Sequence, residues 1–436
     1  MADPVLTTTL LFAGMALFLA LGVPIAIALG GLSIGMIYLF WSPMALTMVP
    51  IKAFSTASSF EYVAIPLFIF MAAMLQRARI ADDLYDTMQK FFGGLRGGLA
   101  VGTIVICTLF AAMAGISGAA TISMGMIAIP SMLARGYGKD ITLGSIAAGG
   151  SLGILIPPSV TMIVYGIIAN TSIGKLYAAG LFPGLVIATL FCAYLIIRGW
   201  LQPEISGGLH LQRYSWNEKL RSLKGLVLPL SLIVAVMGSI LTGVASVSEA
   251  SAVGAGGAIL CAAVLGRLNW YTLRDASQET LLLTCMIFWI IIGATAISTF
   301  YTAMGASRLI EGLVLGLEIN RWVILIAMLS ILFVMGMLLD TVGIIMITVP
   351  IFVPIIIKLG FDPVWFGILF IIMMEIGFLT PPFGYNLFYL RGVSPPSVRM
   401  TDIYRSVVPF IGLMLIGVAL CMIFPQIVLF LPDLVF

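Results

Sequence analysis

The sequence predicts an all-α protein that crosses a membrane many times and consists of two inverted structural repeats. Of its 436 residues, 61% are apolar and only 9% are charged, whereas soluble domains carry about 25% charged residues. The apolar runs are long and continuous and do not alternate, which favours membrane helices over a β-barrel. A water-soluble globule is therefore excluded, and the lipid bilayer is the solvent of most of the chain.

Both halves are expected to contain the same elements in order: three helices, a polar linker, a re-entrant hairpin, a broken helix and a final helix. In the first repeat, residues 1–198, these elements are 5–22, 24–41, 60–76, 77–96, 97–134, 141–170 and 177–198. A cytoplasmic linker at 199–224 follows. In the second repeat, residues 225–436, they are 225–243, 247–266, 278–301, 302–319, 320–358, 363–390 and 405–431.

The hairpins and broken helices are distinguished by length and by proline. Segments 97–134 and 320–358 are nearly twice as long as a membrane pass and carry small or polar residues midway, which predicts re-entrant hairpins. Segments 141–170 and 363–390 contain Pro-Pro in their middles. A second proline removes another backbone donor and forces the preceding residue out of the helical region, so these helices should be broken.

The two halves also match residue by residue. The stretch from Gly153 to Pro158 corresponds to the stretch from Gly377 to Pro382 at an offset of 224, and Tyr165 corresponds to Tyr389 at the same offset. With both termini outside, 16 of the 21 Lys and Arg residues fall in segments expected inside, as the positive-inside rule requires. The first hairpin then opens inward and the second opens outward. Inverted repeats with interrupted helices are typical of secondary transporters that bind substrate near the membrane midplane.

Candidate binding residues lie at the hairpin tips and helix breaks, where backbone groups lose their helical partners. Such groups are tolerated at membrane depth when they line a cavity or contact a ligand. Carbonyl groups can coordinate a cation, and helix N-termini favour anions. The candidate sodium- or substrate-binding residues are Ser117, Gly118, Gly150, Ser151, Gly153 and Pro157 in the first half, and Asp340, Thr341, Gly377, Thr380, Pro381 and Asn386 in the second.

Three acidic residues in apolar segments need separate interpretations. Asp340 lies beside a hairpin tip, and an ionisable group at that depth indicates function. Glu375 precedes the second break, where a packing role and a ligand role are both open. Glu249 follows Ser246 by three residues, which predicts helix capping.

Other classes of protein lack their required residues. The stretch Gly115-Ile-Ser117-Gly118 matches the motif of intramembrane serine proteases, but the single histidine, His210, lies outside every membrane segment and cannot serve as the base. No phosphate-binding loop is present, so ATP hydrolysis is not expected. No basic block indicates nucleic acid, and neither an enzymatic activity nor a bound cofactor is predicted. A channel is left open, although nothing resembles a repeated filter.

Four stretches carry a family resemblance: Gly149-Gly150-Ser-Leu-Gly-Ile-Leu-Ile-Pro-Pro-Ser159, Gly174-Lys-Leu-Tyr-Ala-Ala-Gly180, Ser248-Glu249-Ala-Ser-Ala-Val-Gly254 and Glu375-Ile-Gly-Phe-Leu-Thr-Pro-Pro-Phe-Gly384. They resemble the large, DctM-like permease subunit of tripartite ATP-independent periplasmic (TRAP) transporters, in the ion transporter superfamily. The stretch Ile116–Thr121 is more remotely similar to the hairpin tip of sodium–dicarboxylate elevator transporters. Gly118 replaces the asparagine of that tip, so its side-chain ligand is missing here.

The resemblance implies an importer of the bacterial or archaeal inner membrane with an elevator mechanism driven by sodium, the coupling ion. Expected partners are a periplasmic substrate-binding protein and a small four-helix membrane subunit, which should be a separate chain because almost nothing precedes the first helix. The substrate is expected to be a small organic acid, such as a dicarboxylate, a 2-oxo acid or a sugar acid. Proton coupling and a self-sufficient organic anion transporter are the alternatives.

Overall fold

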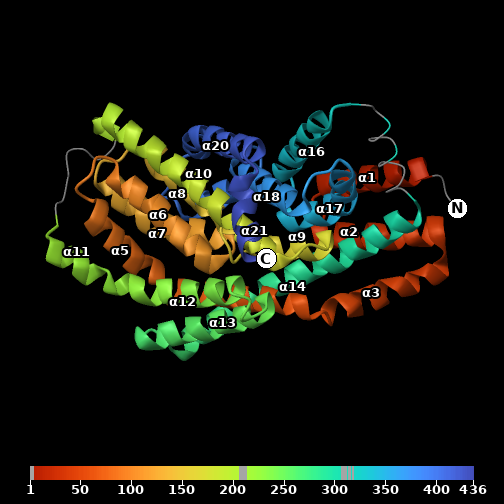
Figure 1. Ribbon diagram of the computed structural model, residues 1–436, viewed down its shortest axis with the longest axis horizontal. Helices are drawn as coiled ribbons and strands as arrows, with labels where there is room; N and C mark the ends of the chain where they lie inside the picture. Colours follow the sequence, from red (N-terminus) through yellow and green to blue (C-terminus); the bar gives the residue numbers. More distant parts are fainter. Residues whose placement is uncertain (1–3, 206–213, 306–311, 313–315, 317–318) are drawn as a thin grey trace.

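The computed structural model describes residues 4–205, 214–305, 312, 316 and 319–436, and helices make up nearly all of this part of the chain. Eight helices in these ranges are long and apolar enough to cross a membrane. The all-α membrane fold predicted from the composition is therefore confirmed. Figure 1 shows the N-terminus at one end of the long axis, and α5 (Ile80–Phe92) and α11 (Trp216–Ser222) at the other.

The first half follows the expected order with one addition. A short helix, α3, lies between the second and third predicted helices, where the sequence analysis placed no element; its polar residues and Pro50 hid it. The elements are α1 (Pro4–Ala20), α2 (Ile25–Met36), a π-turn (Ile37–Trp41), a 3-10 turn (Pro43–Thr47), α3 (Met48–Ala57), a 3-10 turn (Phe60–Val63), α4 (Ala64–Arg77), α5, α6 (Gly98–Ala114), α7 (Ser117–Ala134), α8 (Lys139–Ser151), a 3-10 turn (Leu152–Ile154), α9 (Val160–Ala169), α10 (Ile173–Leu201) and a 3-10 turn (Pro203–Ile205).

The second half differs from expectation in two places: α14 begins at Trp270 and not near 278, and the expected final helix 405–431 is interrupted at Phe424 and Pro425. The Asn269 side chain caps α14 by accepting from the Thr272 amide at 2.8 Å. Helix α11 belongs to the linker, and the elements after it are α12 (Lys224–Leu241), α13 (Val247–Val264), α14 (Trp270–Ala303), α16 (Arg321–Gly336), α17 (Thr341–Lys358), α18 (Pro363–Leu379), α19 (Tyr385–Val393), α20 (Met400–Ile423) and α21 (Gln426–Val435). Parts of the predicted linkers, 206–213 within 199–224 and most of 306–318 within 302–319, lie outside the described residues.

Both Pro-Pro stretches interrupt helices. Residues 155–159, which we name the first break, separate α8 and its 3-10 extension from α9, and residues 380–384, the second break, separate α18 from α19. The α6–α7 pair forms a first hairpin that turns at Gly115–Ile116, and the α16–α17 pair forms a second hairpin that turns at 337–340. The chain therefore folds into the paired hairpins and broken helices on which the predicted site depends.

Labelling tests the opposite entry of the two hairpins. We expect a single cysteine at Leu95, which precedes the first hairpin and is 56% exposed, to react with an impermeant thiol reagent only from inside. A cysteine at Lys358, the exposed last residue of the second hairpin, should react only from outside. Both variants need a background without the five native cysteines. Reaction of both positions from the same face would contradict the inverted arrangement.

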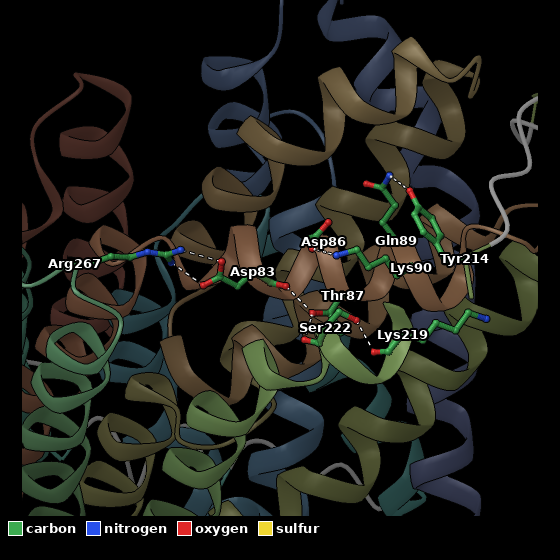
Figure 2. A network of polar contacts seen from close by, with 9 residues as sticks. All are labelled: Asp83, Asp86, Thr87, Gln89, Lys90, Tyr214, Lys219, Ser222 and Arg267. Atoms are coloured by element: carbon green, nitrogen blue, oxygen red, sulfur yellow. Dashed lines mark hydrogen bonds and ion pairs between the residues drawn. The ribbon is translucent and has the colours of Figure 1, made fainter. Parts of the chain in front are cut away.

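The amphipathic helix α5 is held by polar contacts at both of its ends (Figure 2). The Arg267 guanidinium, in the turn before α14, donates to both carboxylate oxygens of Asp83 at 2.7 and 3.0 Å. Its hydrogen bond to Asp83 raises the pKa of Arg267. Farther along α5, the Thr87 hydroxyl donates to the Ser222 carbonyl of α11 at 3.0 Å, and Gln89 donates to the Tyr214 hydroxyl at 3.3 Å. The segment that leads into the first hairpin is thus tied to two neighbouring elements.

The bidentate pair between Arg267 and Asp83 should contribute more to stability than an ordinary surface pair. A double-mutant cycle with Arg267→Gln and Asp83→Asn should give a coupling of about 1 kcal/mol in thermal unfolding, the upper end for partly exposed pairs. The matched control is Lys90 with Asp86, an i,i+4 pair on α5 itself, for which about 0.3–0.5 kcal/mol is expected. Equal coupling energies would show that Arg267 does not anchor α5.

Candidate functional site

A cavity of about 120 Å³ lies where the two hairpin turns meet residues that flank the two helix breaks. The turn of the first hairpin and the turn of the second reach it from opposite halves of the sequence. Its lining residues are Gly115, Ile116, Ser117, Gly118, Ile154, Val160, Thr161, Leu283, Met286, Ile287, Asp340, Thr341, Val342, Phe378, Tyr385 and Tyr389. Asp340 is the only ionisable carboxylate or cation among these described residues.

The first hairpin turn packs directly on the first break. Gly115 has φ +63°, and a Cβ there would lie 2.6 Å from the Pro158 carbonyl oxygen, so only glycine fits this approach. The Val160 amide donates to the Gly115 carbonyl at 3.3 Å. A Cβ on Gly153 would lie 3.0 Å from the Ser117 Cα. These contacts fix the start of α7 beside the start of α9.

The second hairpin turn positions the acidic side chain. Asp340 is half-buried and is the N-cap of α17, where its Oδ2 accepts the Val342 amide at 3.0 Å. The positive end of the α17 dipole favours an ionised carboxylate at this place. Beside the turn, α16 and α18 cross in close contact, because a Cβ on Gly377 would lie 2.6 Å from the Gly336 carbonyl carbon.

One hydrogen bond joins the two halves at the cavity. The Ser117 hydroxyl donates to the Asn386 Oδ1 at 2.9 Å, and both residues are buried. A Cβ on Gly118 would lie 2.8 Å from the Tyr389 ring, so the start of α7 also packs against α19. The hairpin of the first half therefore contacts the broken helix of the second half.

Two buried polar atoms beside the cavity have no hydrogen-bond partner among the described residues: the Thr341 hydroxyl, which belongs to the lining, and the Asn386 side-chain nitrogen. Buried polar groups are normally satisfied, so these two atoms are available to a ligand that enters the cavity. The Asp340 carboxylate, the Thr341 hydroxyl and the Ser117–Asn386 pair together form a polar site within an apolar protein interior.

The sequence-predicted residues divide into three groups. Ser117, Gly118, Asp340 and Thr341 line the cavity, and Asn386 is joined to it through Ser117. The second group does not line the cavity. Its members lie in the two breaks or in the helical segment just before the first break, and they are Gly150, Ser151, Gly153, Pro157, Thr380 and Pro381. Gly377 forms the third group, since it lies at a helix crossing.

Local hydrogen bonds occupy several groups in the second set. The Ser151 hydroxyl donates to the Ala148 carbonyl at 2.8 Å, and the Thr380 hydroxyl donates to the Ile376 carbonyl at 2.6 Å. The Thr380 amide donates to the Gly377 carbonyl at 3.1 Å. These side chains therefore point along their own helices in this structure.

Sequence reasoning missed part of the cavity lining. Leu283, Met286 and Ile287 of α14 form part of it, as do Tyr385 and Tyr389 of α19. Three apolar residues in a long apolar helix carry no signal that separates them from lipid-facing ones. Tyr385 follows the second break directly and Tyr389 lies one turn further along α19, so their position after the break was the available signal.

The other two acidic residues have distinct environments. Glu249 forms a capping box with Ser246, whose amide donates to the Glu249 carboxylate at 2.8 Å, as the sequence predicted. Glu375 is fully buried in α18, and neither carboxylate oxygen has a hydrogen-bond partner among the described residues. A buried carboxyl group of this kind is costly unless it is neutral or binds a cation.

Two larger cavities lie elsewhere, around the turn between α9 and α10. Their volumes are about 870 and 730 Å³, and both include Ile167 and Asn170 in their linings. Neither lining contains a described residue of the two hairpin turns. The smaller cavity is therefore the candidate site, because of these three cavities it alone is lined by residues of both hairpin turns, including Ser117 and Asp340.

A helical membrane protein whose paired hairpins and broken helices enclose a polar site has the architecture of a membrane transporter. Residues 12–427 match the family described as "Tripartite ATP-independent periplasmic transporter, DctM component". The chain belongs to this family of TRAP transporter large permease subunits. It is accordingly a multi-pass protein of the inner membrane and a transport protein, not an enzyme.

Relatives with different transported compounds share nearly the full length. The C4-dicarboxylate TRAP transporter large permease protein of Pseudomonas aeruginosa is 34% identical, over 92% of this chain and 93% of that protein. The ectoine/5-hydroxyectoine TRAP transporter large permease protein of Ruegeria pomeroyi is 33% identical, over 98% of this chain and 99% of that protein. The crystal structure of the Alcanivorax borkumensis YdaH transporter is similar in fold, with a TM-score of 0.62, 13% identity and coverage of 95% and 99% of the two chains.

Proposed function

We propose that this chain imports a small organic acid in symport with sodium, and that a periplasmic substrate-binding protein delivers the acid. A separate small four-helix membrane subunit completes the transporter. The family's tripartite description and the named cargo of the Pseudomonas aeruginosa relative support this proposal. A dicarboxylate, a 2-oxo acid or a sugar acid fits the expected class of substrate.

The observation that carries the proposal is the charge of the cavity. Asp340 supplies a negative charge, and the described residues of the lining include no lysine, arginine or histidine. An organic anion about 4 Å from that carboxylate would be repelled by about 4 kcal/mol at an effective dielectric constant of 20. A sodium ion between the two charges turns this repulsion into attraction. The acid would then bind well only after the cation, which is the thermodynamic basis of coupling.

Oxygen ligands for such a cation are available on both sides of the cavity. Hard cations prefer carboxylate, hydroxyl and carbonyl oxygens. Asp340 and Thr341, with Thr380 nearby, would form one sodium site. Ser117, Gly118, Ser151 and Gly153 would form the other, which relies on backbone oxygens because that half lacks an acid.

The elevator motion is part of the same proposal. Both hairpins and both broken helices contact one another around the cavity, whereas α14 supplies only the apolar wall of Leu283, Met286 and Ile287. We expect the contacting group to move as one body past α14. Movement past an apolar wall breaks no hydrogen bond between the two parts.

A second candidate function is proton-coupled transport of an organic anion. Its support is Glu375, a buried carboxyl group without a hydrogen-bond partner among the described residues. In that case Glu375 or Asp340 would carry the proton. A self-sufficient transporter, independent of a binding protein, is the remaining alternative.

Uptake into proteoliposomes distinguishes these functions. Vesicles containing both membrane subunits, with the loaded binding protein outside, should accumulate the acid when a sodium gradient is imposed. A pH gradient alone, in sodium-free buffer, should drive no accumulation. Omission of the binding protein should reduce uptake to background. Uptake driven by the pH gradient would reject sodium coupling, and strong uptake by this chain alone would reject the tripartite proposal.

A further inference from the structure

An apolar groove of about 380 Å³ runs along the second hairpin and is closed on one side by Phe12 of α1. Its lining side chains, such as Val323 and Ile331, are almost all aliphatic or aromatic. Thr348 is the one polar residue in the lining, and its hydroxyl already donates to the Ile344 carbonyl at 2.7 Å. The described lining side chains therefore leave no hydrogen-bonding group for a polar ligand.

The length of the groove matches one leaflet of a bilayer. Its wall extends along α16 from Val323 to Met335, and twelve residues of α-helix rise about 18 Å. A hydrocarbon core about 30 Å thick gives each leaflet about 15 Å. Val323 and Ile331 are 53% and 50% exposed, so the groove opens sideways.

The width of the groove suits a single hydrocarbon chain. The groove has a volume of about 380 Å³, and its lining comes from the second hairpin, Ile319 and Phe12 of α1. An acyl chain can fill such a slot without hydrogen bonds.

Cationic side chains lie at the end where the second hairpin opens. Arg321 precedes the groove residue Ile324 by one helical turn, and Lys358 follows the groove residue Ile355 by one turn. The Arg321 guanidinium carbon lies 5.1 Å from the centroid of the Phe361 ring. Arginine and lysine beside aromatic rings are typical of the lipid headgroup level.

The positive charge at this mouth is unusual for its side of the membrane. Only five Lys and Arg residues are expected outside, and two of them, Arg321 and Lys358, lie about one helical turn from residues of the groove; Lys358 also lines the cavity of about 730 Å³. Asp362 follows Phe361 in the sequence, and its Oδ1 accepts the amides of Val364 and Trp365 at 2.7 and 2.9 Å. The mouth is therefore suited to a phosphate group.

We propose that the groove binds one anionic phospholipid of the outer leaflet. One acyl chain lies between α1 and the second hairpin, and the phosphate contacts Arg321 and Lys358. The lipid thereby connects α1 to the hairpin that carries Asp340. The two cations determine which headgroup is preferred, and the length of the apolar wall determines how far the acyl chain extends into the membrane.

Native mass spectrometry of the purified full chain, stripped of lipid and titrated with phosphatidylglycerol or phosphatidylethanolamine, tests the headgroup contact. One phosphatidylglycerol should bind with clear preference over phosphatidylethanolamine. Arg321→Gln should weaken phosphatidylglycerol binding about tenfold, which corresponds to about 1.4 kcal/mol. Lys52→Gln, at an exposed cation of α3 on the same side of the membrane, is the control and should have no effect. Unchanged binding by Arg321→Gln overturns the proposal.

Two further variants test the acyl chain. Ala327→Phe fills the groove and should reduce the retained phospholipid, whereas Val227→Phe, at an exposed position of α12, should not. A photo-reactive side chain at Ile331 should cross-link to lipid in native membranes. Full lipid retention by folded Ala327→Phe, or cross-links from residue 331 to another protein chain in place of lipid, overturns the proposal.

Discussion

Asp340→Asn should raise the sodium concentration for half-maximal uptake at least about tenfold while leaving the protein folded. The substitution removes the negative charge but keeps one side-chain oxygen. Asparagine is as good an N-cap as aspartate, so the hydrogen bond to the Val342 amide and the start of α17 should persist. A tenfold loss corresponds to about 1.4 kcal/mol of cation binding, which is modest for a direct charge interaction.

The expected change follows from the position of the carboxylate. An acid at membrane depth costs at least about 2.5 kcal/mol on insertion scales. The N-terminus of α17 offsets part of this cost, and a bound cation would offset more. Sodium-dependent uptake in proteoliposomes, measured over a range of sodium concentrations at constant ionic strength, gives the half-saturation value directly.

The chain offers a matched control in Asp362→Asn. Asp362 is the N-cap of α18 and accepts the Val364 and Trp365 amides, so it has the same local role as Asp340. It is exposed and absent from the cavity lining. Asp362→Asn should therefore leave sodium dependence unchanged. Unchanged dependence in Asp340→Asn as well would exclude Asp340 from the ion site.

The helix breaks were predictable because their cause is local. Pro157-Pro158 and Pro381-Pro382 forbid a continuous helix wherever they occur, and the structure interrupts both helices there. The capping box of Ser246 and Glu249 is also a local pattern with fixed spacing. Features that depend on neighbouring residues alone therefore emerge from the sequence.

Contacts across the chain were not predictable in the same way. Ser117 and Asn386 were each selected because of a nearby tip or break, but their hydrogen bond joins residues 269 positions apart. The α14 wall had no signal at all, because Met286 is one apolar residue among many in a helix of 34 residues. Which face of an apolar helix meets a cavity is decided by packing, and a hydrophobic pattern does not encode it.

Gly377 shows how one sequence signal can have two meanings. It was selected as a binding residue because it precedes the second break. The structure places it against Gly336, where helices α16 and α18 cross with their backbones in contact. Small residues permit such close crossings in membranes. The position of Gly377 is therefore explained by packing, without a ligand.

Gly377→Ala should accordingly destabilise the protein and leave the ion affinity of the folded fraction unchanged. The added Cβ would lie 2.6 Å from the Gly336 carbonyl carbon and 2.7 Å from its Cα, and backbone atoms cannot rotate away as a side chain can. Overpacking of this kind costs about 1–3 kcal/mol. The apparent melting temperature in detergent should fall by several degrees, and the amount of folded protein in membranes should fall with it.

Gly412→Ala is the control, because Gly412 lies within α20 and a Cβ there would meet no atom within 4 Å. Both substitutions gain about 1 kcal/mol of helix propensity, so their difference isolates the clash at the α16–α18 crossing. Sodium titrations of uptake, normalised to folded protein, then separate packing from binding. The contrary outcome is a Gly377→Ala protein that melts at the same temperature as the Gly412→Ala protein but needs more sodium for uptake. That result would place the Gly377 backbone at the ion site, and the close helix crossing would then not explain why this residue is glycine.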